Sequence, residues 1–148
     1  MEKILIFIRM IMTMFYLIAS ILSTTRFKNQ KKSVYMFTSL GIINVIFSFI
    51  GYMNYGQVGL GTVFCTCFII PTIILLTILN NESFFKMMFN LLTIIHSVII
   101  LSLLGSTYNL FFKDSLIADI LLRLIFGITF LMFFRYCLNS KDFSYKNY

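Results

Sequence analysis

Five long apolar stretches, separated by short polar segments, fill most of this chain. They cover residues 4–23, 35–52, 61–79, 84–104 and 116–138. Each is close to the ~20 residues that an α-helix needs to cross ~30 Å of hydrocarbon. Because hydrocarbon offers no hydrogen-bond partners, the backbone of such a stretch must satisfy itself as a helix. The pattern predicts an all-α fold, a helical bundle with five transmembrane helices that forms a single integral membrane domain over residues 1–148.

The composition strengthens this interpretation. Hydrophobic residues make up 59% of the chain and charged residues only 11%, whereas soluble domains are about 45–50% apolar and about 25% charged. The longest polar segments, residues 24–33 and 139–148, are too short to form a soluble domain. We therefore expect the lipid bilayer to surround most of the chain.

The net charge of +7 could suggest nucleic-acid binding, but the basic residues lie at the ends of the apolar stretches and form no patch on a polar surface. In membrane proteins, such residues set orientation, with Lys and Arg enriched on the cytoplasmic side. Placing the first loop in the cytoplasm gathers eight basic residues there and leaves Lys3 and Lys113 outside. The eight are Arg26, Lys28, Lys31, Lys32, Lys86, Arg135, Lys141 and Lys146. The sequence thus predicts no nucleic-acid partner, and a multi-pass protein of the cytoplasmic membrane with its amino terminus outside and its carboxy terminus in the cytoplasm.

The first apolar stretch could also be a cleaved signal peptide. Arg9 interrupts it, and no clean small-x-small cleavage site precedes Thr24. Cleavage would also leave the basic loop outside, against the orientation rule. We expect a true membrane span.

The ionisable residues Arg9, Asp119 and Arg123 stand inside the apolar stretches, where a charge costs at least ~2.5–3.5 kcal/mol. Arg9 lies in the first stretch, and Asp119 and Arg123 lie four residues apart in the fifth, so that the latter two can pair on one helix face. If the two helices are neighbours, Arg9 reaches the same carboxylate. The sequence predicts an intramembrane polar cluster of Arg9, Asp119 and Arg123, with snorkelling of Arg9 and Asp119 to the interface as the alternative.

A second candidate is a polar stripe in the fourth stretch, formed by Lys86, Asn90, Thr93, His96 and Ser97. A membrane histidine can relay protons or sense pH. It can also be a neutral hydrogen-bonding core residue, which we expect for His96. Neutral polar residues of this kind more often serve helix packing.

Two further features concern the backbone. Pro71 interrupts the third stretch and predicts a kink, either a hinge or a simple packing feature. Residues 53–60, which include Gly56 and Gly59, predict a short outer loop that connects two spans or rims an outward-facing site.

No motif for catalysis is evident. The chain has one histidine, five scattered acidic residues and no Gly-rich phosphate loop. Its three cysteines, Cys65, Cys67 and Cys137, lack metal-site spacing. We expect no enzyme activity, no cofactor and no metal site.

Three segments resemble the amino-terminal membrane region of bacterial sensor histidine kinases with a GHKL-type ATPase domain. They are the basic loop Arg26-Phe-Lys-Asn-Gln-Lys-Lys32, the polar link Asn80-Asn-Glu-Ser-Phe-Phe-Lys86 and the closing segment Phe133-Phe-Arg-Tyr-Cys-Leu138. The resemblance implies reception of an extracellular peptide or other signal. That family usually has further spans and a cytoplasmic dimerisation and ATPase portion, which these residues do not contain. The resemblance therefore implies a sensor part without its output: a truncated product, a degenerate copy or a split partner.

The sequence therefore predicts a sensor or receptor module that signals through helix packing and association with a membrane or cytoplasmic protein, or with a second copy of itself. Two alternatives stay open. One is a small subunit of a transport or export complex, with His96, Lys86 and Asn90 along a polar path, and the other is a structural membrane protein without a ligand.

Overall fold

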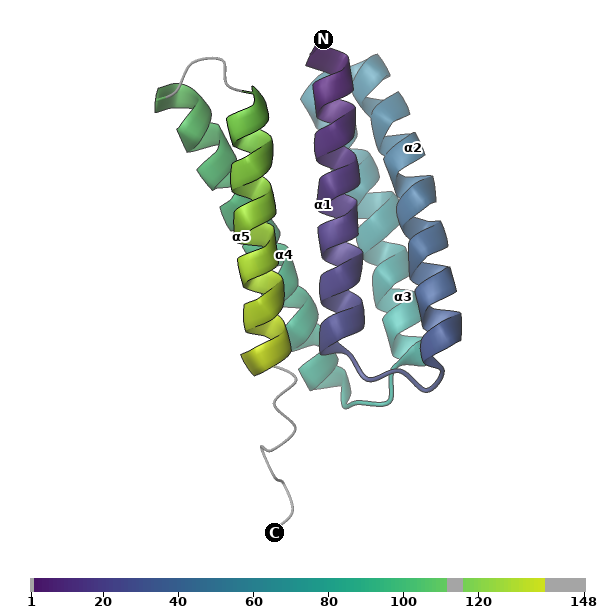
Figure 1. Cartoon of the computed structure of the whole chain (residues 1–148). Helices are drawn as coiled ribbons and strands as arrows, with labels where there is room; N and C mark the ends of the chain where they lie inside the picture. Colours follow the sequence, from purple (N-terminus) through teal and green to yellow (C-terminus); the bar gives the residue numbers. More distant parts are fainter. Residues whose placement is uncertain (1, 112–115, 138–148) are drawn as a thin grey trace.

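The computed structural model describes residues 2–111 and 116–137; for residues 2, 57, 106, 109–111, 116–119 and 137 it describes the backbone alone. The described chain is all-helical, as the sequence predicts, and contains no strand (Figure 1). Its elements are α1 (Glu2–Thr24), α2 (Gln30–Phe64), the π-helix η1 (Cys65–Ile69), α3 (Ile70–Leu79), α4 (Phe84–Phe111) and α5 (Leu116–Cys137).

Four helical stretches within the described residues are long and apolar enough to cross a membrane. They are Lys3–Thr24, Gln30–Gly56, Val58–Leu79 and Phe84–Gly105. These lengths and compositions fit a multi-pass membrane protein. The fifth predicted span coincides with α5, which begins at Leu116 and ends at Cys137.

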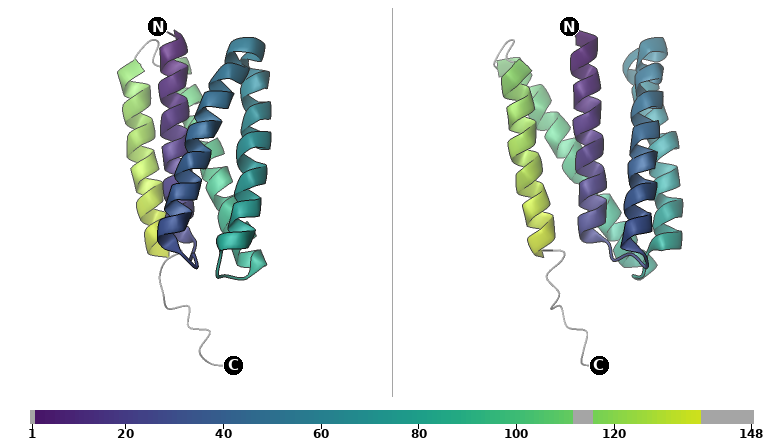
Figure 2. Two further views of the ribbon diagram at one scale, coloured as in Figure 1. Left: turned by 90° about the vertical axis from the view of Figure 1, so that its right-hand side faces the viewer. Right: turned by 45° about the vertical axis from the view of Figure 1, so that its right-hand side comes forward.

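The chain reverses direction inside α2, at Gly56. This residue has φ 62° and ψ −144°, a conformation that residues with a Cβ rarely adopt. The two legs of the resulting helical hairpin lie side by side (Figure 2). Residues 53–60, which the sequence predicts as an outer loop, are therefore helical on both sides of Gly56. The helical hydrogen bonds satisfy the backbone almost up to the point where the chain reverses.

Two other glycines allow the legs of this hairpin to touch through their backbones. A Cβ added to Gly59 would collide with the carbonyl oxygen of Gly51, and a Cβ added to Gly51 would lie 3.0 Å from the carbonyl oxygen of Gly59. Small residues at such a crossing let membrane helices approach closely.

The interruption predicted at Pro71 takes the form of a π-helix just before it. Pro71 stands in the first turn of α3, and the N–H of Ile70 donates to the carbonyl of Cys65, five residues earlier. Proline has no N–H to donate. The wider helical turn brings the chain to Pro71 without breaking the helix.

The loops at the opposite end of the bundle are hydrogen-bonded to one another. The N–H of Lys28 donates to the carbonyl of Leu79 at 3.0 Å, and the N–H of Asn81 donates to the carbonyl of Arg26 at 2.9 Å. Phe27 and Asn80 thereby form a single antiparallel bridge. This pairing joins the loop between α1 and α2 to the loop between α3 and α4.

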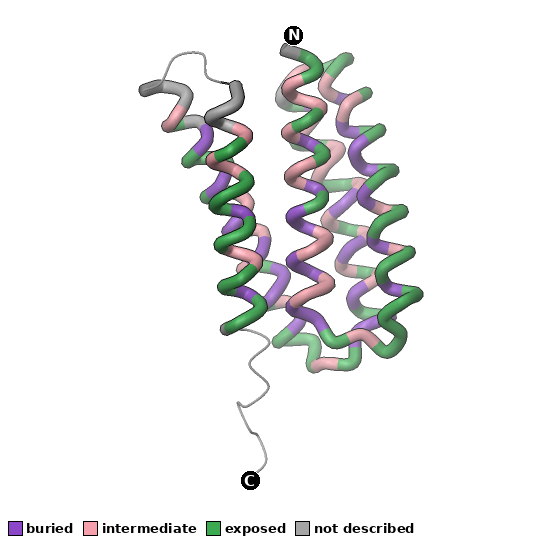
Figure 3. The backbone as a smooth tube through the Cα atoms, in the orientation of Figure 1, coloured by how far each residue is buried: buried purple, intermediate pink, exposed green. Residues whose placement is uncertain are grey.

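Helix α1 is the centre of the bundle and packs against α2, α4 and α5. Leu17 and Ile21 of α1 are fully buried, together with Phe37 of α2, Leu76 of α3 and Ile94 of α4. Large apolar side chains are exposed on α2, among them Ile42, Ile46 and Phe47. Figure 3 shows exposed residues along the outward side of this helix. An apolar surface of this extent is suited to lipid.

Candidate functional site

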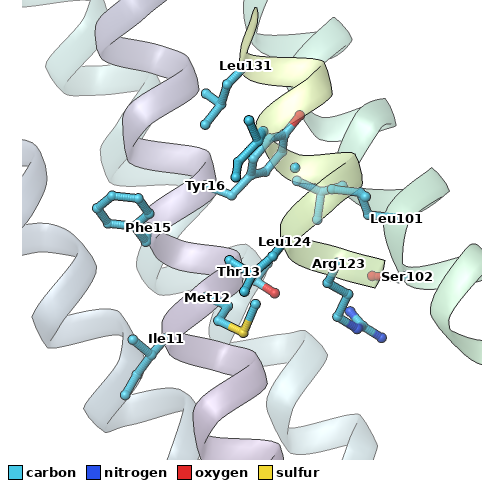
Figure 4. A pocket seen from close by; sticks show the side chains of 13 residues that line it. Ile11, Met12, Thr13, Phe15, Tyr16, Leu101, Ser102, Arg123, Leu124 and Leu131 are labelled. Atoms are coloured by element: carbon cyan, nitrogen blue, oxygen red, sulfur yellow. The ribbon is translucent and has the colours of Figure 1, made fainter. Parts of the chain in front are cut away.

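A pocket of about 370 Å³ lies between α1, α4 and α5 (Figure 4). Its volume falls in the lower part of the ~300–1,000 Å³ range of small-molecule sites. The walls are apolar apart from a few groups of Thr13, Tyr16, Ser102 and Arg123. The lining consists of Ile11, Met12, Thr13, Phe15, Tyr16, Val98, Leu101, Ser102, Arg123, Leu124, Gly127, Ile128 and Leu131.

Gly127 leaves room for the pocket on the α5 side. A Cβ built on it meets only the ring of Tyr16, at an ordinary van der Waals distance of 3.6 Å. This separation is wider than the backbone contact of Gly51 with Gly59. The pocket therefore lies beside a glycine that faces an aromatic ring, and not beside one that faces the backbone of another helix.

Arg123 is the one charged residue of the lining, and it is half-buried. Its side chain lies at the end of the pocket away from Leu131, and its guanidinium points away from Met12 and Thr13 (Figure 4). A guanidinium remains protonated in proteins and carries five N–H donors. The pocket thus combines a fixed positive charge at one end with an apolar cavity.

The predicted cluster of Arg9, Asp119 and Arg123 requires α1 and α5 to be neighbours, and they are. Arg9 is half-buried on α1, and its carbonyl accepts a hydrogen bond of 2.8 Å from Thr13 Oγ1. Arg9 does not line the pocket. The side chain of Asp119 lies outside the described residues, so the cluster stays a prediction.

The predicted stripe on α4 divides between two faces of the helix. Asn90 and Ser97 are buried toward α1, and Thr93 is half-buried. Lys86 and His96 are exposed. The five residues therefore do not form one continuous polar surface.

The buried part of the stripe holds α4 against α1. The amide of Asn90 donates to the carbonyl of Thr24 at 3.3 Å, and Tyr16 Oη lies 2.8 Å from Ser97 Oγ. The Ser97 hydroxyl donates its hydrogen to the carbonyl of Ile94 at 2.7 Å. Because a hydroxyl has one hydrogen, Tyr16 is the donor to Ser97.

The exposed residues of the stripe make local contacts only. Lys86 Nζ pairs with Glu82 Oε1 at 2.7 Å, one turn before it. Nδ1 of His96 lies 2.8 Å from the carbonyl of Leu92. His96 lies on the outward face and not in the core as predicted, because Leu91, Ile94 and Ser97 define the inward face of α4.

The described basic residues are distributed unequally between the two ends of the bundle. The end of α1, the start of α2, the start of α4 and the end of α5 lie together (Figure 1). This end carries the exposed residues Arg26, Lys28, Lys31, Lys32, Lys86 and Arg135. Lys3 lies at the other end, near the amino terminus.

No group of three or more His, Cys, Asp and Glu residues able to hold a metal ion occurs within residues 2–111 and 116–137. The sequence did not predict the pocket, although Arg123 stands out in the fifth stretch as a charged residue among apolar ones. Most of the lining is Leu, Ile, Met and Phe, which carry no signal that separates a cavity wall from core or lipid-facing surface.

Comparisons with sequence models of protein families, with curated proteins and with solved structures find no match for this chain.

Proposed function

We propose that this chain is a five-span protein of the cytoplasmic membrane, with its amino terminus outside and its carboxy terminus in the cytoplasm. Two observations support this arrangement. Helix α5 is 22 residues long and mostly apolar, which matches the length of a span. The exposed basic residues gather at one end of the bundle, as expected of a cytoplasmic side.

We further propose that it acts as a sensor or receptor module that signals through a partner protein. The observation that carries this proposal is the pocket between α1, α4 and α5, which is lined by side chains of all three helices. A ligand there would favour one spacing of α1 against α5, and only by its difference in affinity for the two spacings. Both helices end at the basic end, where a partner would respond to that spacing.

A transport subunit is the second function that the sequence suggests, and we place it behind the sensor. A polar path for an ion would need His96, Lys86 and Asn90 on a common surface. Asn90 is buried against α1, whereas His96 and Lys86 are exposed and make local contacts. The pocket contains none of the three.

Reporter fusions test the membrane arrangement. Fusions after positions 30, 82 and 148 should report from the cytoplasm, and fusions after positions 56 and 112 from outside. An external signal from the fusion after position 148 would contradict the proposed orientation and the count of five spans.

Photo-crosslinking in cells tests the signalling role. A photoreactive amino acid replaces the exposed Lys31, and the pocket is filled by Gly127→Leu. We expect a crosslinked partner whose yield changes in Gly127→Leu. The control Gly61→Leu, at a glycine with open space around it, should leave the yield unchanged. An absent partner, or equal yields in the two variants, would overturn the sensor proposal.

A further inference from the structure

Residues 26–32, the basic loop between α1 and the first turn of α2, carry four cations: Arg26, Lys28, Lys31 and Lys32. All four are exposed, and no ion pair within residues 2–111 and 116–137 involves any of them. We propose that the basic loop binds the headgroups of anionic phospholipids in the surrounding bilayer. This inference requires that the helices cross a membrane, but it needs neither the proposed partner protein nor the proposed orientation.

Lys86, at the same end of the bundle, shows how the protein itself can neutralise a basic residue there (Figure 1). Its Nζ lies 2.7 Å from Oε1 of Glu82. Among the described residues of this end, Glu82 is the only acid, and Lys86 already pairs with it. The cations of the basic loop therefore have no counter-ion in the described part of the chain, so an anion from outside can supply one.

The backbone of the basic loop is held in place by hydrogen bonds before any ligand binds. The N–H of Lys28 and the carbonyl of Arg26 are bonded to the loop between α3 and α4. The N–H of Lys32 donates to Oδ1 of Asn29 at 3.1 Å, which caps the start of α2. Because the backbone that carries the four charges is already fixed, a ligand does not have to order it.

The charges of the basic loop lie where the protein alone does not favour them. Lys31 and Lys32 stand in the first turn of α2, which contains no acidic residue. The positive end of the helix dipole lies at this turn and favours negatively charged groups. Four like charges so close in sequence also repel one another. An anionic headgroup beside these side chains offsets both unfavourable effects.

The neighbours of the basic loop favour a membrane surface over a soluble acidic protein as its partner. Helix α1 ends at Thr24 and α2 begins at Gln30, so the four cations lie within a few residues of two apolar spans. Tyr35, one turn after Lys31, is 75% exposed, and Phe85 in the first turn of α4 is 85% exposed. Tyrosine is enriched at the membrane–water interface, and basic residues there attract anionic lipids. A bilayer accommodates the charges and these rings together, whereas a soluble acidic protein would match only the charges.

Two exposed tyrosines of α2 provide a matched pair of reporter positions. The chain contains no tryptophan, so an introduced one is the sole indole and reports its own surroundings. Tyr35→Trp places the indole beside the basic loop, and Tyr55→Trp places it at the opposite end of the same helix leg, next to Gly56. The two tyrosines are almost equally exposed, at 75% and 76%.

Each variant is reconstituted in phosphatidylcholine nanodiscs and titrated with acyl-dibrominated phosphatidylglycerol, which is anionic, or acyl-dibrominated phosphatidylcholine, which is zwitterionic. Bromine quenches tryptophan fluorescence on contact. We expect the anionic lipid to quench Tyr35→Trp at about fivefold lower content than the zwitterionic lipid, the factor given by one basic residue near the membrane surface. The Tyr55→Trp variant should respond equally to both lipids.

Replacing all four cations of the basic loop by glutamine in Tyr35→Trp should abolish the preference for the anionic lipid. The control Lys3→Gln, which removes an exposed lysine at the other end of the bundle, should change nothing. A preference that persists without the four cations would overturn the proposal.

Equal quenching of Tyr35→Trp by the two lipids would also overturn the proposal, and would favour a soluble acidic protein as the partner of the basic loop. This outcome is read with the loop intact, so it decides the question even if the glutamine variant fails to fold. A nanodisc has the same lipids on both faces and contains no partner protein. A negative result would therefore reject the lipid-binding surface and leave the fusion and crosslinking tests as separate results.

Discussion

Two glycine-containing contacts in this bundle have opposite consequences. In the α2 hairpin, Gly59 faces the backbone of Gly51 so closely that no Cβ fits between them. Between α1 and α5, Gly127 faces the ring of Tyr16 at van der Waals distance, and a pocket remains beside it. Glycine thus allows backbone contact between the two legs of the α2 hairpin, whereas between α1 and α5 it leaves space for a pocket. What a glycine does inside a membrane bundle is therefore determined by the group opposite it.

The largest effect is expected where the closed contact is broken. Gly59→Ala places a methyl group against the carbonyl group of Gly51. This carbonyl belongs to the backbone and cannot move out of the way by a side-chain rotation. We expect a loss of about 3 kcal/mol of unfolding free energy, the upper part of the usual range for overpacking. Titration of the protein in mixed micelles with sodium dodecyl sulfate measures it.

The matched control is Gly61→Ala, two residues further along the same leg. No atom lies within 4 Å of a Cβ built there. This variant should be neutral or slightly stabilising, by at most ~1 kcal/mol, because alanine is the better helix former. Equal destabilisation by the two substitutions would mean that the loss in Gly59→Ala does not come from its contact with Gly51.

An intermediate effect is expected for Tyr16, which lines the pocket and also holds α4. Tyr16→Phe removes the hydrogen bond to Ser97 but keeps the ring beside Gly127. Ser97 still donates to Ile94. We expect a loss of about 0.6–1 kcal/mol, the lower part of the range for hydrogen bonds between membrane helices.

The same titration measures this variant, and Ser97→Ala tests the pairing. In the double variant, the two losses should be less than additive, because both remove the same bond. Simple additivity would show that the Tyr16 hydroxyl stabilises the bundle by another route.

The smallest effect on stability is expected at the open contact. Gly127→Ala adds a methyl group 3.6 Å from the Tyr16 ring, where there is space for it. We expect a change within ~0.5 kcal/mol, as for substitutions that disturb no packed group. If Gly127→Ala lost as much unfolding free energy as Gly59→Ala in the micelle titration, the Gly127 contact would be as tightly packed as the Gly51–Gly59 contact, against the expectation.

Much of the fold follows from the spacing of apolar residues. The predicted stretch 116–138 corresponds to α5 at Leu116–Cys137, and the first stretch, 4–23, corresponds to α1 at Glu2–Thr24. The long runs specify these helices because hydrocarbon leaves the backbone no other partner than itself. The extent of α2 was harder to predict. The polar residues at 53–60 suggest a loop, but in the structure the helix continues on both sides of Gly56, where the chain reverses.

The site was only partly predictable. Arg123 stands out because a charge inside an apolar stretch is costly. The remaining walls belong to helices far apart in sequence, and how each helix is rotated about its axis depends on tertiary packing. His96 illustrates this, because hydropathy places it inside the membrane but does not distinguish the inner face of α4 from the outer face.

The pairing of residues 26–28 with residues 79–81 bears on the order of biosynthesis. The N–H of Lys28 and the carbonyl of Arg26 find their partners in a segment that the ribosome makes only after the third apolar stretch. During synthesis, the loop between α1 and α2 therefore cannot form these two hydrogen bonds until that later segment has been made. In this protein the earliest turn to be synthesised is among the last to acquire its final structure.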